Sequence, residues 1–222
     1  MKMRIASLSL LALCLTLAAL PAMADNIYDN GPINGTTDGW TINFGFVVSD
    51  TFNVGGSGAT VTGLNFGAWL FEGDTLESAE VSITSQENGG TVFSDQVVNF
   101  TQSGCVGNQY GYNVCTESSS GMTPVSLAGG TYWLNLQNAV VNTGDPVYWD
   151  ENSGVGCGGG GCPSQASENS VGTIPGEAFT VLGSATTTSG TTTTSTVPEP
   201  SSFMLFGSGI LGLASLLRRK LF

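Results

Sequence analysis

The stretch ATVTGLNFGAWLF, residues 59–71, decides the fold class, because β-branched and aromatic residues are frequent in it and no helical period runs through it. Gly63 and Gly67 interrupt its apolar residues. Glycine inside such a run weakens a strand and often marks a bend. The stretch therefore predicts two short strands that are broken at the two glycines.

Runs of the same kind recur on both sides of this stretch. In WTINFGFVV, residues 40–48, the side chains of Ile42, Phe44, Phe46 and Val48 recur at a period of two and share one face. An apolar face of this kind predicts a strand that packs on a hydrophobic core.

The pair Gly129-Gly130 predicts a β-hairpin. The apolar residues at alternate positions on its two sides are Val125 and Leu127 before the glycines and Tyr132, Leu134 and Leu136 after them.

No convincing amphipathic helix lies between Asp25 and Gly183. Roughly ten short strands separated by turn residues indicate one all-β domain. The sequence therefore predicts a single antiparallel β-sandwich of jelly-roll type over residues 25–183.

The first 24 residues have the parts of a secretory signal peptide in the usual order. Lys2 and Arg4 form a short positive region, an apolar run follows, and A-M-A ends at Ala24. We expect cleavage between Ala24 and Asp25, and an exported protein. A transmembrane helix is the alternative, but the apolar run is short and a cleavage site follows it.

The C-terminal end has three parts in a fixed order. They are the tripeptide Pro198-Glu199-Pro200, the uncharged run 203–217 and the basic cluster Arg218-Arg219-Lys220. The prolines disfavour a helix, the run predicts a transmembrane helix, and the basic cluster predicts a stop on the cytoplasmic side. The helix would span roughly 22 Å, which is short of a hydrocarbon core of about 30 Å unless flanking residues help.

Residues 184–197, SATTTSGTTTTSTV, contain no aromatic and no charged residue and have no apolar period. This composition predicts a linker between the β domain and the tail. O-glycosylated threonines and a bare extended spacer are both compatible with it.

The tail resembles the PEP-CTERM sorting signal, in which a V-P-E-P stretch, one glycine-bearing apolar helix and a terminal basic cluster follow each other. The resemblance implies an exported bacterial surface protein that is processed by an exosortase, a membrane-embedded enzyme associated with exopolysaccharide and biofilm systems. It covers residues 198–222, and a plain tail anchor is the alternative. More loosely, GAWLFEGDTLESAEVSIT and GGTYWLNLQNAVVNTGDPVYWDENSG are similar to phrases in the ectodomains of other PEP-CTERM proteins, a similarity that implies no activity.

The charges are separated along the chain. All five Lys and Arg residues lie in the two ends, there is no His, and all seventeen Asp and Glu lie between Asp25 and Glu199. An exported domain without a side-chain cation cannot neutralise phosphates, which excludes nucleic acid and anionic lipid as partners.

Four cysteines remain after removal of the signal peptide: Cys105, Cys115, Cys157 and Cys162. An even count in an exported chain predicts two disulfides. Three pairings are possible, and proximity in sequence favours Cys105 with Cys115 and Cys157 with Cys162. A zinc site is the alternative, but the C-x-x-C spacing and histidine are both missing.

The acidic loops suggest a cation. Calcium takes oxygen ligands, and Asp145, Asp150 and Glu151 lie in an acidic, Asn-rich loop that could supply them. The alternative is a solvated acidic surface, because the loop does not match a known calcium motif.

Catalysis has few residues available. Without His and Lys the domain cannot build a Ser-His-Asp, Cys-His or Ser-Lys site, which leaves paired carboxylates of the kind that glycosidases use. The candidate pairs are Glu72 with Asp74 and Asp150 with Glu151. Solvated residues at strand ends are the alternative, and we expect no catalytic residue.

The tryptophans suit a milder role. Aromatic rings can stack on sugars, and Trp149, beside three polar residues, and Trp133, on the face opposite to Tyr132, are the candidates for carbohydrate contact. Core packing is the alternative, because aromatic residues favour strands in any case.

The sequence therefore predicts a non-enzymatic, exported protein of the cell surface or extracellular matrix. Signal peptidase and exosortase would process it, the C-terminal helix would hold it in the cytoplasmic membrane meanwhile, and polysaccharide is the expected ligand. The second hypothesis is a carboxylate-dependent glycan hydrolase.

Overall fold

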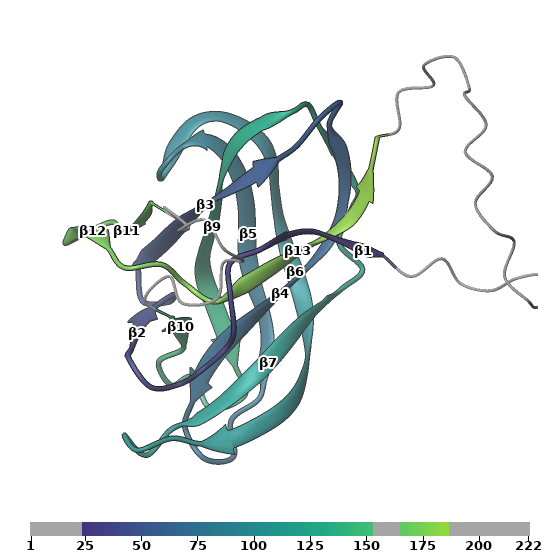
Figure 1. Cartoon of the computed structure of the whole chain (residues 1–222). Coiled ribbons are helices and arrows are strands. Elements are labelled where there is room, and N and C mark those ends of the chain that lie inside the picture. Colours follow the sequence, from purple (N-terminus) through teal and green to yellow (C-terminus); the bar gives the residue numbers. More distant parts are fainter. Residues whose placement is uncertain (1–23, 153–164, 187–222) are drawn as a thin grey trace, which may run out of the picture. The chain divides into compact units, whose positions relative to one another are not determined.

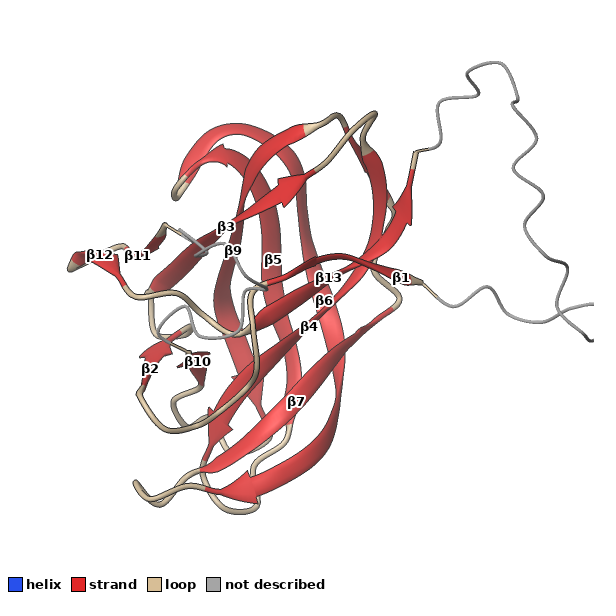
Figure 2. Ribbon diagram, viewed as in Figure 1, coloured by secondary structure: helices blue, strands red, loops and turns tan. Residues whose placement is uncertain are grey.

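The computed structural model describes residues 24–152 and 165–186 of the chain (Figure 1). This part consists of strands and connecting loops, and it contains no helix (Figure 2). The same residues accordingly offer no helical segment with the length and apolarity needed to cross a bilayer. The predicted signal peptide before Ala24, the tripeptide Pro198-Glu199-Pro200 and the predicted helix 203–217 lie outside the described residues.

The strand bounds are β1 Asp25–Asp29, β2 Asp38–Thr41, β3 Val47–Val54, β4 Ala59–Leu70, β5 Leu76–Gln86, β6 Gly89–Gly107, β7 Asn113–Ser120, β8 Val125–Leu127, β9 Gly130–Val141, β10 Tyr148–Glu151, β11 Ala166–Glu168, β12 Gly172–Ile174 and β13 Phe179–Ala185.

Hydrogen bonds join the 13 strands into one sheet, whose main order is β1-β13-β4-β7-β6-β5-β9-β3-β11-β12. Every pairing between strands is antiparallel. β4 is the centre of the topology, because it pairs with β13, β7, β8 and β10. The all-β class is thus confirmed, whereas the two separate sheets of a jelly-roll sandwich stay a prediction.

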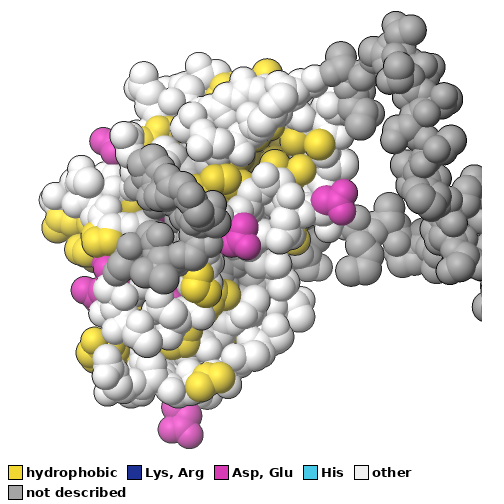
Figure 3. Space-filling model, viewed as in Figure 1, with side chains coloured by type: hydrophobic (Ala, Val, Ile, Leu, Met, Phe, Trp, Pro, Cys, Tyr) yellow, Lys and Arg dark blue, Asp and Glu magenta, His cyan; other side chains and the backbone are white. Residues whose placement is uncertain are grey.

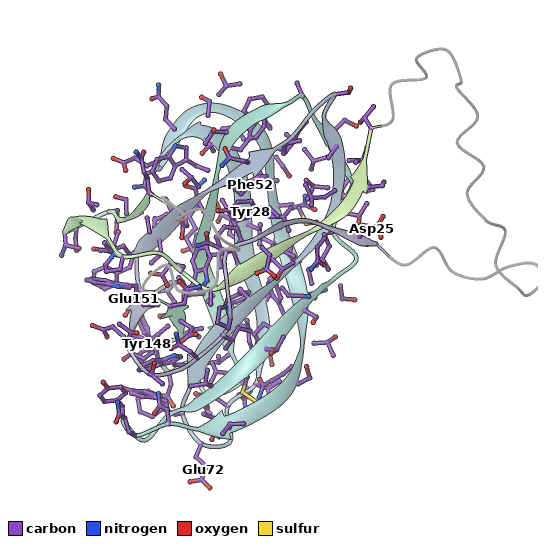
Figure 4. All side chains as sticks on the ribbon, in the orientation of Figure 1. Asp25, Tyr28, Phe52, Glu72, Tyr148 and Glu151 are labelled. Atoms are coloured by element: carbon purple, nitrogen blue, oxygen red, sulfur yellow. A yellow bond between two sulfur atoms is a disulfide. The ribbon has the colours of Figure 1, made fainter. Side chains whose placement is uncertain are left out.

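The sheet is curled, and its concave side encloses the hydrophobic core (Figures 1 and 2). Alternation along the strands fills this core: in β5, Leu76, Ala79, Val81 and Ile83 are all buried. Tyr28 of β1 reaches Phe52 of β3, with ring centroids 6.3 Å apart (Figure 4). Two strands that are far apart in the main order therefore contact each other across the core.

The stretch 59–71 forms one strand and not two. Gly63 and Gly67 both lie inside β4, where the bulk of a side chain would collide with neighbours: a Cβ on Gly67 would be 2.7 Å from Cβ of Asp150 and 2.8 Å from Ile33. These glycines permit close approach of other segments to the strand, which is the second use of glycine in strands.

The stretch 40–48 is interrupted. β2 ends at Thr41 and β3 begins at Val47, and Phe44 in the turn between them has a φ of 57° and is 65% exposed. Ile42 and Val48 are buried as predicted, but the shared apolar face is wrong for Phe44 and Phe46, because the turn ends the period of two.

The predicted hairpin at Gly129-Gly130 is also wrong. β8 pairs with β4, and β9 pairs with β3 and β5. The glycines instead let the loop turn tightly over the β3–β4 connection, where a Cβ on Gly129 would be 2.5 Å from the carbonyl oxygen of Gly56.

Contacts between residues divide the chain after Thr186. β13 includes Ser184 and Ala185, which pair with Thr60 and Ala59. The sheet thus extends two residues into the segment that the sequence predicts as a linker.

Candidate functional site

Trp149 lies in the core, so that core packing is the correct alternative for this residue and the carbohydrate contact is wrong. Its side chain is fully buried, its Nε1–H donates to the carbonyl oxygen of Ala178 at 3.0 Å, and its ring meets Phe66 and Phe179 edge to face. The ring is buried because this face of β10 is turned toward the core, which includes Phe66 of β4 and Phe179 of β13. Trp149 cannot contact a sugar in this position.

Trp133 is half-buried on β9, where it lies opposite Thr51 of β3 and Thr84 of β5. Tyr132 is the more buried of the two neighbours and contacts Phe52. Trp133 therefore stays a candidate for surface contact.

Glu72 and Asp74 lie in the loop between β4 and β5, so that the alternation of a strand does not place them on one face. Glu72 is exposed and points away from the sheet (Figure 4). Asp74 is buried, and its carboxylate accepts a hydrogen bond from the hydroxyl of Thr143 at 2.7 Å.

Asp150 is fully buried and holds the loop that precedes β2. Its carboxylate accepts three hydrogen bonds, from the backbone N–H of Asn34 at 2.8 Å, the backbone N–H of Gly35 at 3.0 Å and the indole N–H of Trp69 at 2.5 Å. Burial raises the pKa of Asp150, and these three donors oppose the rise. The three contacts give this carboxylate a structural role.

Glu151 faces another neighbour. Its carboxylate accepts a hydrogen bond from the indole N–H of Trp40 at 2.8 Å, and burial raises its pKa against the effect of that donor. Asp145 is exposed in the loop before β10, with its backbone carbonyl bonded to the side chain of Asn43. Across residues 24–152 and 165–186, no three acidic or cysteine side chains form a group that could hold a metal ion.

Four further buried carboxylates carried no signal in the sequence: Asp50, Glu117, Glu168 and Glu177. Both oxygens of Glu117 and of Glu177 are without a hydrogen-bond partner in the described part of the chain. Burial raises the pKa of Glu117 to about 7. Burial, together with the nearby carboxylates of Asp50 and Glu151 in particular, raises the pKa of Glu177 well above its ordinary value.

The predicted disulfide between Cys105 and Cys115 is present and joins β6 to β7. Cys157 and Cys162 lie outside the described residues, and their pairing stays a prediction.

A pocket of about 530 Å³ lies between this disulfide-linked hairpin and the loop that Asp150 holds. The residues that line it are Ile33, Asn34, Gly35, Thr36, Gly104, Val106, Gly107, Asn108, Gln109, Val114 and Thr116. None of them carries a charge, and the polar side chains are amides and hydroxyls. The volume is in the range of small-molecule sites, roughly 300–1,000 Å³.

An aromatic cluster adjoins the pocket. Tyr110, at the tip of the hairpin, is 52% exposed and stacks on Trp69 with ring centroids 5.5 Å apart and planes 18° apart. Its hydroxyl lies 3.4 Å from the carbonyl oxygen of Thr36, which lines the pocket. Tyr112 continues the cluster and meets Tyr148 edge to face.

This arrangement was missed from the sequence, although one signal was present. The stretch CVGNQYGYNVC, residues 105–115, encloses two tyrosines and several amides between two cysteines. A disulfide that closes a turn of this composition presents polar and aromatic groups on a short, restrained loop.

The visible face of the domain carries scattered Asp and Glu side chains and no Lys or Arg (Figure 3).

Comparison with known proteins gives a match at the C-terminal end of the chain. A family model described as the PEP-CTERM protein-sorting motif matches residues 196–220. No curated protein and no solved structure matches the chain.

Proposed function

We propose that this chain, an exported protein whose PEP-CTERM motif marks it for processing by exosortase at the membrane, is a non-enzymatic component of the cell surface or extracellular matrix that binds polysaccharide. In this proposal the segment 203–217 anchors the chain in the cytoplasmic membrane during processing, and the protein then joins the exopolysaccharide or biofilm layer.

The observation that supports a polysaccharide ligand is the pocket between the loop 33–36 and the β6–β7 hairpin. Its wall contains amides and hydroxyls and no charged group, and the exposed Tyr110 lies beside it, with its hydroxyl 3.4 Å from the carbonyl oxygen of Thr36. Sugars present hydroxyl groups that hydrogen-bond to amides, and apolar ring faces that pack on aromatic rings.

The alternative of a carboxylate-dependent glycan hydrolase has less support. Such an enzyme needs two carboxyl groups on opposite sides of one bond, about 5–9 Å apart. Glu72 is exposed on a loop, Asp74 and Asp150 are buried with hydrogen-bond donors, and none of them lines the pocket. Calcium stays a proposal for the acidic loop that contains Asp145.

A pull-down with the host's own polysaccharide tests this function. The exported protein, purified from its host, is incubated with immobilised polysaccharide from the same culture, once with calcium and once with a chelator. We expect retention in at least one condition. The absence of retention in both would refute the ligand, and the release of shorter chains would favour the hydrolase.

A further inference from the structure

We propose that the pocket between the loop 33–36 and the β6–β7 hairpin binds one sugar unit of a neutral polysaccharide, and that the ring of Tyr110 forms the stacking platform at its rim. The inference rests on the proposed function and adds to it the place and the chemical class of the ligand.

The groups of the pocket wall are complementary to a neutral, polar ligand. Asn108 and Gln109 on the hairpin, Thr116 on β7, and Asn34 and Thr36 on the opposite loop carry the amides and hydroxyls of the wall. The side-chain oxygens of Asn34 and Asn108 already accept hydrogen bonds from Thr36 and from the backbone N–H groups of Tyr110 and Tyr112, whereas Nδ2 of Asn108 has no partner within the described residues. Amides and hydroxyls both donate and accept, which matches sugar hydroxyl groups that do the same. Val106 and Val114 supply apolar surface between them.

Tyr110 is suited to stacking. One side of its ring is supported by Trp69, in a nearly parallel arrangement, while half of the residue remains exposed. A ring that is held from behind loses little freedom when a ligand covers its open surface, which lowers the entropic cost of binding.

The two walls are fixed before a ligand arrives. The disulfide between Cys105 and Cys115 restrains the hairpin, and residues on both sides of it line the pocket. The opposite loop is fixed by the hydrogen bonds from Asn34 and Gly35 to the buried carboxylate of Asp150. Gly35 has a φ of 63°, and a Cβ there would meet Val114 at 2.5 Å, so that the loop lies directly on β7.

The charge of the domain selects among polysaccharides. Between Asp25 and Glu199 the chain has seventeen acidic residues and no basic one. A surface of one sign repels polymers of the same sign. An uronic-acid-rich chain is therefore disfavoured, whereas a neutral chain pays no such cost and meets an uncharged wall.

Affinity electrophoresis of the exported protein tests this site. The host's polysaccharide is separated by anion exchange into a neutral and an acidic fraction, and each is cast into native gels at increasing concentration. We expect the neutral fraction to retard the protein and the acidic fraction to leave its mobility unchanged. Tyr110→Ala should weaken retardation about tenfold, which corresponds to about 1.4 kcal/mol, because it removes the ring on which the sugar stacks.

Three further variants complete the test, and one of them, Phe93→Ala, is the control outside the site. Tyr110→Phe keeps the ring and should recover most of the binding that Tyr110→Ala loses. Phe93→Ala removes a ring of similar exposure, 42%, with one ring contact to Tyr132, and should not change binding. Thr116→Val keeps the shape of the pocket and removes one hydroxyl, and should weaken binding several-fold even if Tyr110→Ala fails to fold.

The outcomes separate the site from the function. If the protein binds neutral polysaccharide and both Tyr110→Ala and Thr116→Val bind equally well, the site is wrong and the proposed function stands. Retardation by the acidic fraction alone overturns the ligand class. If neither fraction binds, the site and the ligand part of the proposed function fall together.

Discussion

Two buried carboxylates flank the central strand β4, and they differ in their partners. Asp150 lies on β10, which pairs with β4, and its carboxylate accepts hydrogen bonds from three N–H groups. Glu117 lies on β7, opposite Phe66 of β4, and neither of its carboxylate oxygens has a hydrogen-bond partner within the described residues. A buried acceptor with donors organises its surroundings, and one without donors carries the cost of burial alone. The first fixes a pocket wall, and the second makes the core sensitive to pH.

The largest expected effect is at Asp150. Asp150→Ala leaves three N–H groups without their acceptor, and we expect the free energy of unfolding to fall by about 4 kcal/mol. Asp150→Asn is the matched control, because it keeps one acceptor oxygen and should lose clearly less. Urea unfolding at constant pH measures both. A loss below about 1 kcal/mol in Asp150→Ala would remove the structural role.

Replacement of Glu117 should stabilise the protein at neutral pH, whereas replacement of Asp150 should destabilise it. Its pKa is about 7 in the folded protein and lies near the ordinary value of about 4.5 in the unfolded chain. The free energy of unfolding is therefore unaffected by Glu117 below about pH 4.5. As the pH rises from there through about 7, ionisation of Glu117 lowers it by up to about 3 kcal/mol.

Glu117→Gln resembles the protonated acid at every pH. We expect this variant to be more stable than the unmodified protein at pH 8 and equal to it at pH 4, measured by urea unfolding across that range. The difference between the two proteins isolates Glu117 from the other acids. A constant difference across the range would contradict the account.

The hairpin wall should depend on its disulfide. Replacement of Cys105 and Cys115 together by Ser removes the restraint on a loop of sequence separation 10, and the chain-entropy relation gives a loss of about 2.8 kcal/mol. The double variant is preferable to reduction of the whole protein, because a reductant would also act on Cys157 and Cys162. Chemical unfolding with an unchanged midpoint would show that the hairpin is fixed by other contacts.

A smaller loss of stability is expected at Gly67 of β4, which lies against Ile33 of the loop 33–36 and Asp150 of β10. Gly67→Ala would bring a Cβ within 2.7 Å of Asp150, and overpacking of this kind costs about 2 kcal/mol. Gly55→Ala is the control, since nothing lies within 4 Å of a Cβ there. Thermal unfolding of the pair should show a lower midpoint for Gly67→Ala alone.

The class of the fold could be predicted from the sequence, because alternating apolar residues report directly on strands that cover a core. Pairing could not be predicted: the runs around Gly129-Gly130 have the local signs of a hairpin, yet β8 joins β4, and partner choice depends on contacts distant in sequence. The predicted break of the strand at Gly67 was wrong for a related reason. A glycine that permits close approach of another segment cannot be distinguished in sequence from one that bends a strand.

The candidate site divides in the same way. The Cys105–Cys115 disulfide follows from composition and compartment, and the sorting motif from the order of its parts. Trp149 was a candidate for carbohydrate contact because of its polar neighbours, but its ring faces the core, where it packs on Phe66 and Phe179 from strands distant in sequence. Tyr110 gained its place through a contact with Trp69, 41 positions earlier in the chain, which no local pattern announces.

The intact mass of the protein isolated from its own host shows whether the chain is exported and sorted through its C-terminal motif. We expect an N-terminus at Asp25 and a C-terminus close to Pro198-Glu199-Pro200, with residues 203–222 removed. Additional mass on residues 184–197 would report glycosylation of the linker. A mass that extends from Asp25 to Phe222 would mean that the tail is a permanent anchor and would contradict processing by exosortase.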